Sequence, residues 1–304
     1  MALARRVVAV VGPTATGKSA LAIAIAKAIG GEVVNADSMQ LYRGMDIGTA
    51  KVTAAERADV PHHLLDIWPV TYPASVAEYQ QRARAVIDEL HARGAVPVLV
   101  GGSGLYVRAA LDRIEFPGTD PELRAALEAE LATAGSAVLH ERLAARDPAA
   151  AAAILPSNGR RVVRALEVVE LTGRPFTAAL PSYEAVYDAV QVGLDLDDAA
   201  LDRRVEDRVA TMFAAGLVEE VRGLVPLGLQ DGRTASRALG YQQVLAMLEG
   251  ATTEQEAAAA TKAATRRFVR RQRSWFRRDP RIHWLDAVRP DLVAAATALA
   301  DGKN

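Results

Sequence analysis

Residues 7–30 read VVAVVGPTATGKSALAIAIAKAIG, and this stretch decides the fold. Residues 7–11 form an apolar run rich in valine, which is typical of a strand buried on both faces of a parallel sheet. Lys18–Ile29 carries leucine and isoleucine at helical spacing and is followed by two glycines, which end a helix. Residues 12–19 connect the two elements and match the pattern G-x4-G-K-[ST] in full. The stretch therefore predicts the strand, phosphate-binding loop and helix that open a P-loop α/β protein.

The loop at residues 12–19 predicts a polyphosphate ligand. Its glycines allow backbone N–H groups to turn inward around a phosphate, and the helix N-terminus adds partial positive charge. Lys18 supplies a mobile cation, and the hydroxyl of Ser19 can hold Mg²⁺, the one cofactor we expect. We expect the whole loop to contact the ligand, which assigns Gly12, Pro13, Thr14, Ala15, Thr16, Gly17, Lys18 and Ser19 to this site.

Strand-like and helix-like segments alternate along the chain, which predicts a doubly wound α/β sheet. The expected strands are residues 7–11, 32–35, 96–100, 190–194 and 282–285. The expected helices of the sheet region are Lys18–Ile29, 75–93 and Gly104–Leu111.

A helical segment interrupts this alternation. The sequence Phe-Pro-Gly at 116–118 breaks the pattern, and residues 121–173 are alanine-rich with no strand candidate. Pro175 and Pro181 bracket an expected loop. The predicted fold class is therefore α/β, with a P-loop parallel sheet core at 1–115 and 187–304, a helical insertion domain at 116–186 and a helical C-terminal part.

Composition excludes several classes of protein. The chain of 304 residues has no cysteine, so disulfides, thiolate zinc sites and a cysteine nucleophile are excluded. No apolar run approaches the roughly 20 residues that a membrane span needs, and the first residues lack the apolar region of a secretion signal. We expect a cytoplasmic monomer without a membrane partner. The net charge of −1 predicts no nucleic-acid partner by itself, but an average can hide local clusters.

The acidic residue expected near the phosphate loop is Asp37. A P-loop NTPase usually has an acid at the end of a later strand. Here the strand at 96–100 runs into Gly-Gly-Ser-Gly instead, with the hydroxyl of Ser103 between glycines, which weakens the motor and GTPase readings. Small kinases also place an acid after the second strand, and Asp37 can cap a turn, so Asp37 alone does not decide between kinase and transferase.

A basic helix near the C-terminus predicts a surface that contacts phosphates. Residues 257–278 contain seven arginines, Lys262 and no acidic residue. On a helical wheel Phe268 and Trp275 share one side, and four arginines occupy the opposite side. A solvated face normally mixes signs, so this arginine stripe indicates phosphate contacts. Its members are Arg266, Arg270, Arg273 and Arg277, and the alternative is that they brace the fold through carboxylates such as Glu249 or Glu254.

Six blocks of sequence resemble the bacterial tRNA dimethylallyltransferases, in addition to the less specific phosphate loop. They occur in the family's order and the resemblance covers nearly the whole chain. The block DSMQLYRGMDIGTAK is the longest and most specific. The blocks are 37–51, 62–66, 100–106, 161–168, 240–241 and 270–277.

The resemblance implies a reaction and its residues. The diphosphate of dimethylallyl diphosphate lies in the phosphate loop, with Mg²⁺ at Ser19. The adenosine on the 3′ side of the tRNA anticodon is flipped into a channel, and Asp37 acts as general base on its N6 amine. Ser103 stands where the family usually has threonine, so the hydroxyl survives and a methyl group is lost. Arg208 is implied as a further contact to the diphosphate.

The resemblance also implies an RNA-binding surface for the anticodon stem-loop, with the insertion domain at 116–186 in contact with tRNA. Recognition then rests on shape, phosphates and extruded bases. The residues so assigned are Asp37, Ser38, Met39, Gln40, Ser103, Arg160, Arg161, Arg164, Arg237, Gly240, Tyr241, Gln242, Arg270, Arg271, Gln272, Arg273, Ser274, Trp275, Phe276 and Arg277.

The remaining histidine and tryptophan candidates favour structural roles. His62 and His63 follow a proline in an expected loop, and no third metal ligand stands at useful spacing, so a structural or substrate-lining role is favoured over a metal site. Trp68, Trp275 and Trp284 are expected in the core rather than stacked on bases.

Three rival functions remain open at this point. An ATP-dependent small-molecule kinase explains the phosphate loop, but not the arginine stripe or the length past residue 190. In the insertion, Arg160 and Arg164 similarly face away from Val162, Leu166 and Val169, which gives a second arginine-rich surface. A prenyltransferase acting on a free adenine nucleotide shares the chemistry, but does not need arginine-rich surfaces in two regions. A non-enzymatic RNA-binding protein leaves the phosphate loop and Asp37 unused.

Overall fold

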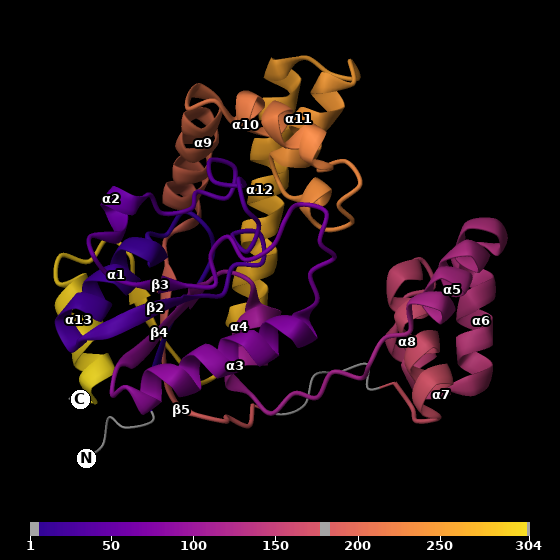
Figure 1. The fold of residues 1–304 in the computed structure, drawn as a ribbon, viewed down its shortest axis with the longest axis horizontal. Coiled ribbons are helices and arrows are strands. Elements are labelled where there is room, and N and C mark those ends of the chain that lie inside the picture. Colours follow the sequence, from indigo (N-terminus) through magenta and orange to yellow (C-terminus); the bar gives the residue numbers. More distant parts are fainter. Residues whose placement is uncertain (1–5, 177–182, 303–304) are drawn as a thin grey trace. The chain divides into compact units, whose positions relative to one another are not determined.

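The computed structural model describes residues 6–176 and 183–302. The chain forms two compact units, one built from Met1–Asp112 with Ala185–Asn304 and the other from Arg113–Glu184 (Figure 1). The second unit is the segment that the sequence places at 116–186. Most of the loop expected between Pro175 and Pro181 lies outside the described residues. So do residues 1–5, on which the expected lack of a secretion signal rests.

The first unit contains a six-stranded sheet in which every neighbouring pair is parallel. The strand order is β3-β2-β4-β1-β5-β6. The strands are β1 (Arg6–Val11), β2 (Gly31–Asn35), β3 (His62–His63), β4 (Val96–Gly101), β5 (Asp188–Asp195) and β6 (Ile282–Asp286). The loops after β1, β2 and β4, three strands that are neighbours in the sheet, therefore emerge together at its carboxyl edge. The parallel sheet with its helices confirms the predicted fold class.

Helices cover both faces of this sheet. Successive side chains of a strand point to opposite faces, so the valine run of β1 is buried on both sides. Val8 packs in one cluster with Leu21 of α1, and Val7 packs in the other with Tyr79 of α3. The helices of this unit are α1 (Lys18–Ile29), α2 (Ala54–Arg57), α3 (Val76–Ala92), α4 (Gly104–Leu111), α9 (Asp198–Ala214), α10 (Leu217–Leu224), α11 (Tyr241–Leu248), α12 (Glu254–Phe276) and α13 (Leu292–Asp301), with short 3-10 turns at Val225–Leu227 and Ala235–Arg237.

The long helix α12 runs for 23 residues from a capped start. Thr253 accepts the N–H of Glu256, whose carboxylate accepts the N–H of Thr253, so both donors are satisfied at the N-terminus. Acidic residues follow in the first turn and arginine stands in the last, which complements the helix dipole. Among residues 6–176 and 183–302, no helix combines the length and the apolar character that crossing a membrane requires.

The pair His62-His63 is a short edge strand, and the prediction that it lies in a loop is wrong. It pairs in parallel with β2, a partner that lies far away in the sequence. His63 Nε2 lies 2.6 Å from the Glu32 carboxylate, which also pairs with Arg93. Within the described part of the chain, no group of three or more histidine, cysteine or acidic side chains could hold a metal. The contacts of His63 are thus those of a structural residue.

The second unit is a helical bundle with its own core. Its helices are α5 (Pro121–Ala134), α6 (Ser136–Arg146), α7 (Pro148–Ala153) and α8 (Gly159–Thr172). Leu127, Leu139 and Leu166 pack together at its centre, each 2% exposed or less. Glu167 of α8 is fully buried and pairs with arginines of α5 and α8.

Candidate active site

The phosphate loop, residues 12–19, leaves β1 at the carboxyl edge of the sheet and leads into α1. Its backbone has positive φ at Gly12 (130°) and Gly17 (90°), where side chains are strained. A Cβ on Gly12 would lie 2.3 Å from the carbonyl oxygen of Leu194, so no side chain fits there. The arrangement of strand, glycine turn and helix N-terminus is the one that places backbone N–H groups around a phosphate.

Lys18 is the cation of this loop, and its Nζ donates to the Pro13 carbonyl over 2.6 Å. Burial, and to a smaller extent the guanidinium of Arg208, lower the pKa of Lys18 to about 7 against the opposing effect of Asp37. Burial likewise lowers the pKa of Arg208, with Asp37 again acting in the other direction. Desolvation disfavours the positive charges of Lys18 and Arg208. A bound anion would therefore be strongly attracted to both side chains, and it would raise their pKa values again.

This environment predicts that the affinity for inorganic diphosphate falls as the pH rises above about 7. A bound anion raises the pKa of Lys18. Below the pKa of the free protein the proton is already present, so the contribution of Lys18 is complete. Above it, binding must draw a proton from solvent, so the affinity falls as the pH rises. The fall stops once the pH exceeds the pKa of Lys18 in the complex.

Isothermal titration calorimetry at about pH 6 to 9 measures this effect as a falling association constant with proton uptake. The matched control is Lys18→Arg, because its guanidinium stays charged throughout this range. The ionisation of diphosphate itself is common to both proteins and cancels in the ratio. A parent and a Lys18→Arg variant with the same pH dependence would contradict the assignment.

Asp37 lies just beyond β2 at the same edge of the sheet. The Asn35 side chain holds its backbone, accepting the Asp37 N–H at 2.9 Å and donating to the Asp37 carbonyl at 3.0 Å. The carboxylate Oδ1 accepts the N–H of Met39 at 3.0 Å. The Tyr79 hydroxyl donates to the Asn35 carbonyl at 2.9 Å, which ties the strand end to α3. The carboxylate is therefore held in one orientation by its own loop, as a positioned proton acceptor requires.

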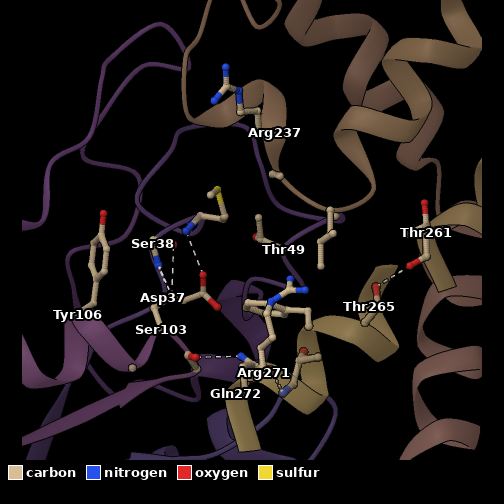
Figure 2. Close-up of a pocket in the computed structure, with 18 of the residues that line it drawn as sticks. Asp37, Ser38, Thr49, Ser103, Tyr106, Arg237, Thr261, Thr265, Arg271 and Gln272 are labelled. Atoms are coloured by element: carbon tan, nitrogen blue, oxygen red, sulfur yellow. Dashed lines mark hydrogen bonds between the residues drawn. The ribbon is translucent and has the colours of Figure 1, made fainter. Parts of the chain in front are cut away.

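Ser103 meets this loop from the end of β4. It is the N-cap residue of α4, and its Oγ accepts the backbone N–H of Ser38 at 3.2 Å and lies 3.3 Å from the Ser38 Oγ. Ser103 therefore joins the loop that carries Asp37 to the loop after β4. Figure 2 shows Asp37, Ser38 and Ser103 close together, with Arg271 and Gln272 of α12 beside them and Thr261 and Thr265 of the same helix farther away.

Asp37, Ser103, Arg208 and, from the phosphate loop, Thr14 line a cavity of about 500 Å³ in the first unit. Its walls come from the phosphate loop, the loop after β2, the start of α4, and helices α9 and α12. The cavity brings together many of the predicted site residues. Those that line it are Thr14, Asp37, Ser38, Met39, Ser103, Arg208, Arg237, Arg271, Gln272 and Trp275. Trp68 is buried as predicted and Trp284 packs against the core, whereas Trp275 also faces the cavity.

Sequence reasoning missed part of the wall that α12 contributes. Thr261, Thr265 and Phe268 face the cavity along with Gln272, and Met212 of α9 lies opposite. The steps of four, three and four residues keep these α12 side chains on one face of the helix. Both threonine hydroxyls donate to the carbonyls four residues earlier, which leaves their methyl groups to the cavity. The helical spacing of these residues was the available signal.

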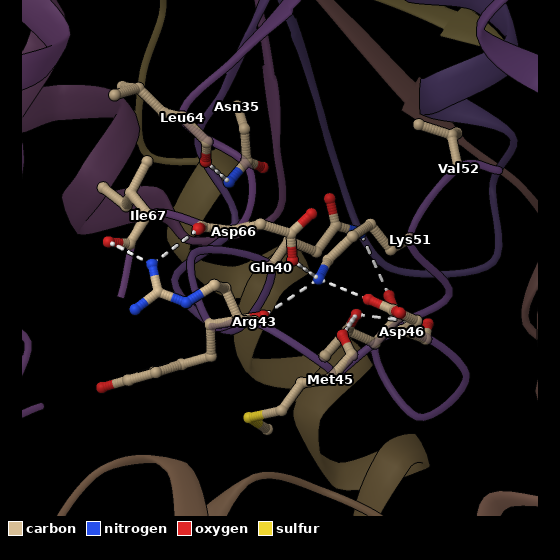
Figure 3. A network of polar contacts seen from close by, with 12 residues as sticks. Asn35, Gln40, Arg43, Met45, Asp46, Lys51, Val52, Leu64, Asp66 and Ile67 are labelled. Atoms are coloured by element: carbon tan, nitrogen blue, oxygen red, sulfur yellow. Dashed lines mark hydrogen bonds and ion pairs between the residues drawn. The ribbon is translucent and has the colours of Figure 1, made fainter. Parts of the chain in front are cut away.

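Lys51 closes the loop that carries Asp37 (Figure 3). Its side chain is 3% exposed, and Nζ lies 2.6 Å from an Asp46 oxygen and 2.5 Å from an Asp66 oxygen. Nζ also donates to the Tyr42 carbonyl at 2.9 Å. One buried ammonium thus ties two points of the loop after β2 to the segment that follows β3. This structural role explains why the block 37–51 ends in a lysine, Lys51.

Glu220 of α10 secures the same loop from the other side. Its carboxylate accepts the backbone N–H groups of Asp46 at 3.0 Å, Ile47 at 2.7 Å and Gly48 at 3.2 Å. The Tyr241 hydroxyl donates to it at 2.5 Å. Sequence reasoning missed Glu220, because an acid on an amphipathic helix normally faces solvent and nothing local indicates its partners.

Four residues of the predicted RNA surface are buried instead. Tyr241 (0% exposed) and Phe276 (3%) belong to the main core, so the prediction that their side chains contact RNA is wrong. Gln272 is 5% exposed and bonds to two loops of the site. Gly240, also buried, begins α11 with φ of 88°. Apolar contacts explain the aromatic residues at 241 and 276, and positive φ explains the glycine at 240. A sequence motif does not distinguish such a structural role from a role in RNA binding.

The arginine stripe of α12 faces carboxylates of β5 and α9. Arg266 pairs with Glu206, and Arg273 pairs with Asp198 and, at 2.7 Å, with Asp195. Arg277 also pairs with Asp195, at 3.1 Å. The bracing carboxylates are therefore supplied by these elements rather than by Glu249 or Glu254. The stripe is uniformly positive within α12, but carboxylates of the neighbouring elements pair with it. A cavity of about 430 Å³ lies between α9 and this face of α12.

Arg164 of the second unit is similarly engaged. It pairs with the buried Glu167 at 2.6 Å and donates to the carbonyls of Pro117 at 2.6 Å and Gly118 at 3.0 Å. Burial acts to raise the pKa of Glu167, but Arg124 and Arg164 hold it below its usual value. Arg164 thus supports the start of the bundle, while Arg160 and Arg161 of the same helix are exposed.

Comparison with known proteins agrees with this geometry. The family model described as IPP transferase matches residues 40–279. The chain is 71% identical over 290 residues to the tRNA dimethylallyltransferase of Salinispora arenicola, covering 95% of this chain and 85% of the relative. It is 64% identical over 301 residues to that of Streptomyces coelicolor, covering 98% and 96%.

Solved structures show the same likeness. The full-length tRNA isopentenylpyrophosphate transferase of Bacillus halodurans matches with a TM-score of 0.74 and 40% identity, covering 98% of this chain and 96% of that one. A eukaryotic dimethylallyltransferase, described as acting on tRNA, matches with a TM-score of 0.80 and 25% identity, covering 97% and 78%. The chain therefore belongs to the IPP transferase family.

Proposed function

We propose that the protein transfers the dimethylallyl group of dimethylallyl diphosphate to the N6 amine of the tRNA adenosine on the 3′ side of the anticodon, releasing diphosphate. One observation carries the proposal: Thr14 of the phosphate loop, Asp37, Ser103 and Arg208 line one cavity of about 500 Å³, and Lys18 is close enough to Asp37 and Arg208 for their charges to shift its pKa. An anion site and a fixed carboxylate on the same cavity suit a reaction in which a diphosphate leaves and a proton is removed. Relatives named tRNA dimethylallyltransferases support the choice of substrates.

The diphosphate end of the donor fits the phosphate loop. The C–O bond of an allylic diphosphate breaks readily, because the positive charge on the departing carbon is shared over the double bond. Lys18, Arg208 and the backbone N–H groups of the loop would stabilise the negative charge that develops on the leaving group. The pKa values of both cations are lowered because burial removes these groups from water. The same burial strengthens their attraction to a bound anion, since water screens the charges less.

The acceptor adenosine fits beside Asp37. An exocyclic adenine amine is a poor nucleophile, because its lone pair is delocalised into the ring. As the nitrogen forms its bond to the allylic carbon, Asp37 takes the departing proton, so positive charge does not build up on the adenine. The cavity wall contributed by Met39, Met212, Phe268 and Trp275 would keep water from capturing the allylic carbon first.

A divalent cation fits this site as a companion of the substrate. Mg²⁺ in such sites takes one or two protein oxygens and completes its shell with phosphate oxygens and water. Ser19, the second residue of α1, would hold it through its hydroxyl. When bound, Mg²⁺ would neutralise part of the charge on the leaving group.

The anticodon stem-loop is the partner we propose for the exposed arginines. Arg237 and Arg271 lie at the cavity and are both exposed, so they can meet phosphates beside a flipped nucleotide (Figure 2). Arg160 and Arg161 would contact RNA from the insertion domain. We propose that the enzyme acts as a monomer in the cytoplasm.

The two classes of arginine on α12 predict different responses to mutation. Arg270 is exposed, so Arg270→Ala should reduce the slope of log affinity for tRNA against log salt by about 0.7–0.9, the value for one lost phosphate contact. Arg273 is held by Asp195 and Asp198, so Arg273→Ala should lower the melting temperature and leave the slope unchanged. Filter binding at several salt concentrations and thermal melts measure both. An unchanged slope for a folded Arg270→Ala protein removes Arg270 from the RNA surface.

The function is tested by incubating the protein with labelled dimethylallyl diphosphate, Mg²⁺ and unmodified tRNA in the absence of ATP. We expect label to move to the RNA. The kinase alternative predicts no transfer of label, together with ATP turnover stimulated by a small hydroxyl compound. Adenosine monophosphate as the acceptor tests the prenyltransferase that acts on free nucleotides, and preferential labelling of it would overturn the tRNA assignment.

A further inference from the structure

Gln272 of α12 joins the two loops on which the reaction depends. Its Oε1 accepts the backbone N–H of Thr14, in the phosphate loop, at 2.9 Å. Its Nε2 donates to the carbonyl of Gly102, the residue before Ser103, at 2.9 Å. The residue is 5% exposed; its bond to Gly102 is buried and its bond to Thr14 is partly buried. A single side chain thus links the site of the leaving group to the site of the acceptor.

The chemistry of these two bonds specifies an amide. One partner is a donor and the other is an acceptor, so the bridging group must accept and donate at once. A glutamine does both at its length, whereas a carboxylate only accepts and a methionine does neither effectively. Asparagine is one methylene shorter and could not keep both distances. The two hydrogen bonds to Thr14 and Gly102 thus explain why residue 272 is a glutamine. Its position in an arginine-rich helix does not explain this choice.

The loop after β4 is shaped to admit this side chain. A Cβ on Gly102 would lie 2.3 Å from Gln272 Nε2, and a Cβ on Gly104 would lie 2.1 Å from the Trp275 ring. A side chain on Gly102 would therefore displace the end of the Gln272 side chain, and one on Gly104 would collide with the Trp275 ring of α12. The close approach of α12 and the position of Ser103 depend on each other.

We propose that Gln272 is a positioning residue that holds the phosphate loop and the Ser103 loop at a fixed separation, so that diphosphate binding and acceptor alignment are set together. It lines the cavity beside Arg271, and both polar atoms of its side chain are bonded to Thr14 and Gly102, so it acts through these two residues. The proposal rests on the proposed function for its catalytic consequence, but its effect on diphosphate binding is independent of prenyl transfer.

The test uses the full chain with Gln272→Met and Gln272→Glu. Gln272→Met keeps the size and removes both bonds. Gln272→Glu keeps the bond to Thr14, loses the donor to Gly102 and places a negative charge beside the phosphate loop. The matched control is Gln230→Met, at an exposed glutamine that bonds to Glu249 and does not line the cavity.

Titration with inorganic diphosphate and Mg²⁺ is the first measurement. We expect Kd to rise by about 5–30-fold in Gln272→Met, the loss of one to two hydrogen bonds, and further in Gln272→Glu because of charge repulsion. Gln230→Met should match the parent. A role limited to stability predicts a lower active fraction with an unchanged Kd. Folded Gln272→Met and Gln272→Glu proteins that both bind diphosphate as the parent does would overturn the proposal.

Steady-state kinetics with dimethylallyl diphosphate and tRNA is the second measurement. We expect Gln272→Met to raise KM for the donor and to lower kcat by about 10–100-fold, since misalignment of about 1 Å costs on this scale. A fall in kcat alone, in proportion to the unfolded fraction, would count against positioning. If the parent transfers no prenyl group, the proposed function fails, and the diphosphate titration still decides the role of Gln272.

Discussion

Replacing Asp37 with asparagine is expected to slow the prenyl-transfer step by about 10²–10⁴-fold, the range for loss of a positioned general base. Asparagine keeps an oxygen that can accept the N–H of Met39, so the loop conformation should survive. The amide cannot take the proton of the adenosine amine, which then stays on the nitrogen as the new bond forms. Single-turnover rates with saturating tRNA measure this step free of product release.

Binding of tRNA should change far less in the same variant. Phosphate contacts dominate affinity for nucleic acids, and Asp37 makes none of them. Filter binding measures this affinity, and Asp59→Asn, an exposed aspartate at positive φ that asparagine tolerates, is the control. Equal losses of rate and of affinity would mean that Asp37 shapes the loop and does not act as the base.

Replacing Lys18 with methionine is expected to lower kcat/KM for dimethylallyl diphosphate by about 10²–10³-fold, the cost of removing one charged donor to a developing anion. Lys18 is partly buried beside Arg208 and close enough to Asp37 to respond to its charge, so little solvent screens its interaction with the diphosphate. Methionine fills a similar volume, so the loop should keep its shape. The kinetic constants with varied donor, at fixed tRNA, measure the loss.

Lys27→Met is the matched control for this variant. Lys27 lies in the last turn of the same helix, exposed and remote from the phosphate loop. Its removal should leave kcat/KM within a factor of about two, as expected of a surface substitution. A Lys18→Met protein that binds diphosphate and turns over like Lys27→Met would show that the phosphate loop does not hold the leaving group.

The elements predicted from sequence were those with strong local signals. Lys18–Ile29 and Gly104–Leu111 begin and end where the sequence places them, because glycines and apolar spacing define their limits. The central strands follow from continuous apolar runs. The edge strand His62–His63 escaped prediction, since two residues make no pattern and their strand character comes only from pairing with β2.

Site residues divide in the same way. The phosphate loop and Asp37 stand in motifs, so the sequence identifies them directly. Glu220 does not, because its role arises from backbone N–H groups some 170 residues away in sequence. The bracing partners of the α12 arginines cannot be identified from sequence for the same reason, since Asp195 and Asp198 lie on other elements. Contacts between distant segments set these roles, and one segment alone does not reveal them.

The central claim is that this cavity joins a dimethylallyl group to one adenosine of tRNA. The most direct measurement is mass spectrometry of nucleosides and oligonucleotides from an unmodified tRNA incubated with the protein, Mg²⁺ and dimethylallyl diphosphate. We expect one dimethylallyl group on the adenosine at the 3′ side of the anticodon and one diphosphate released for each group transferred. A transcript with guanosine at that position should remain unmodified. Intact donor beside unmodified tRNA, with a protein that binds both, would contradict the account.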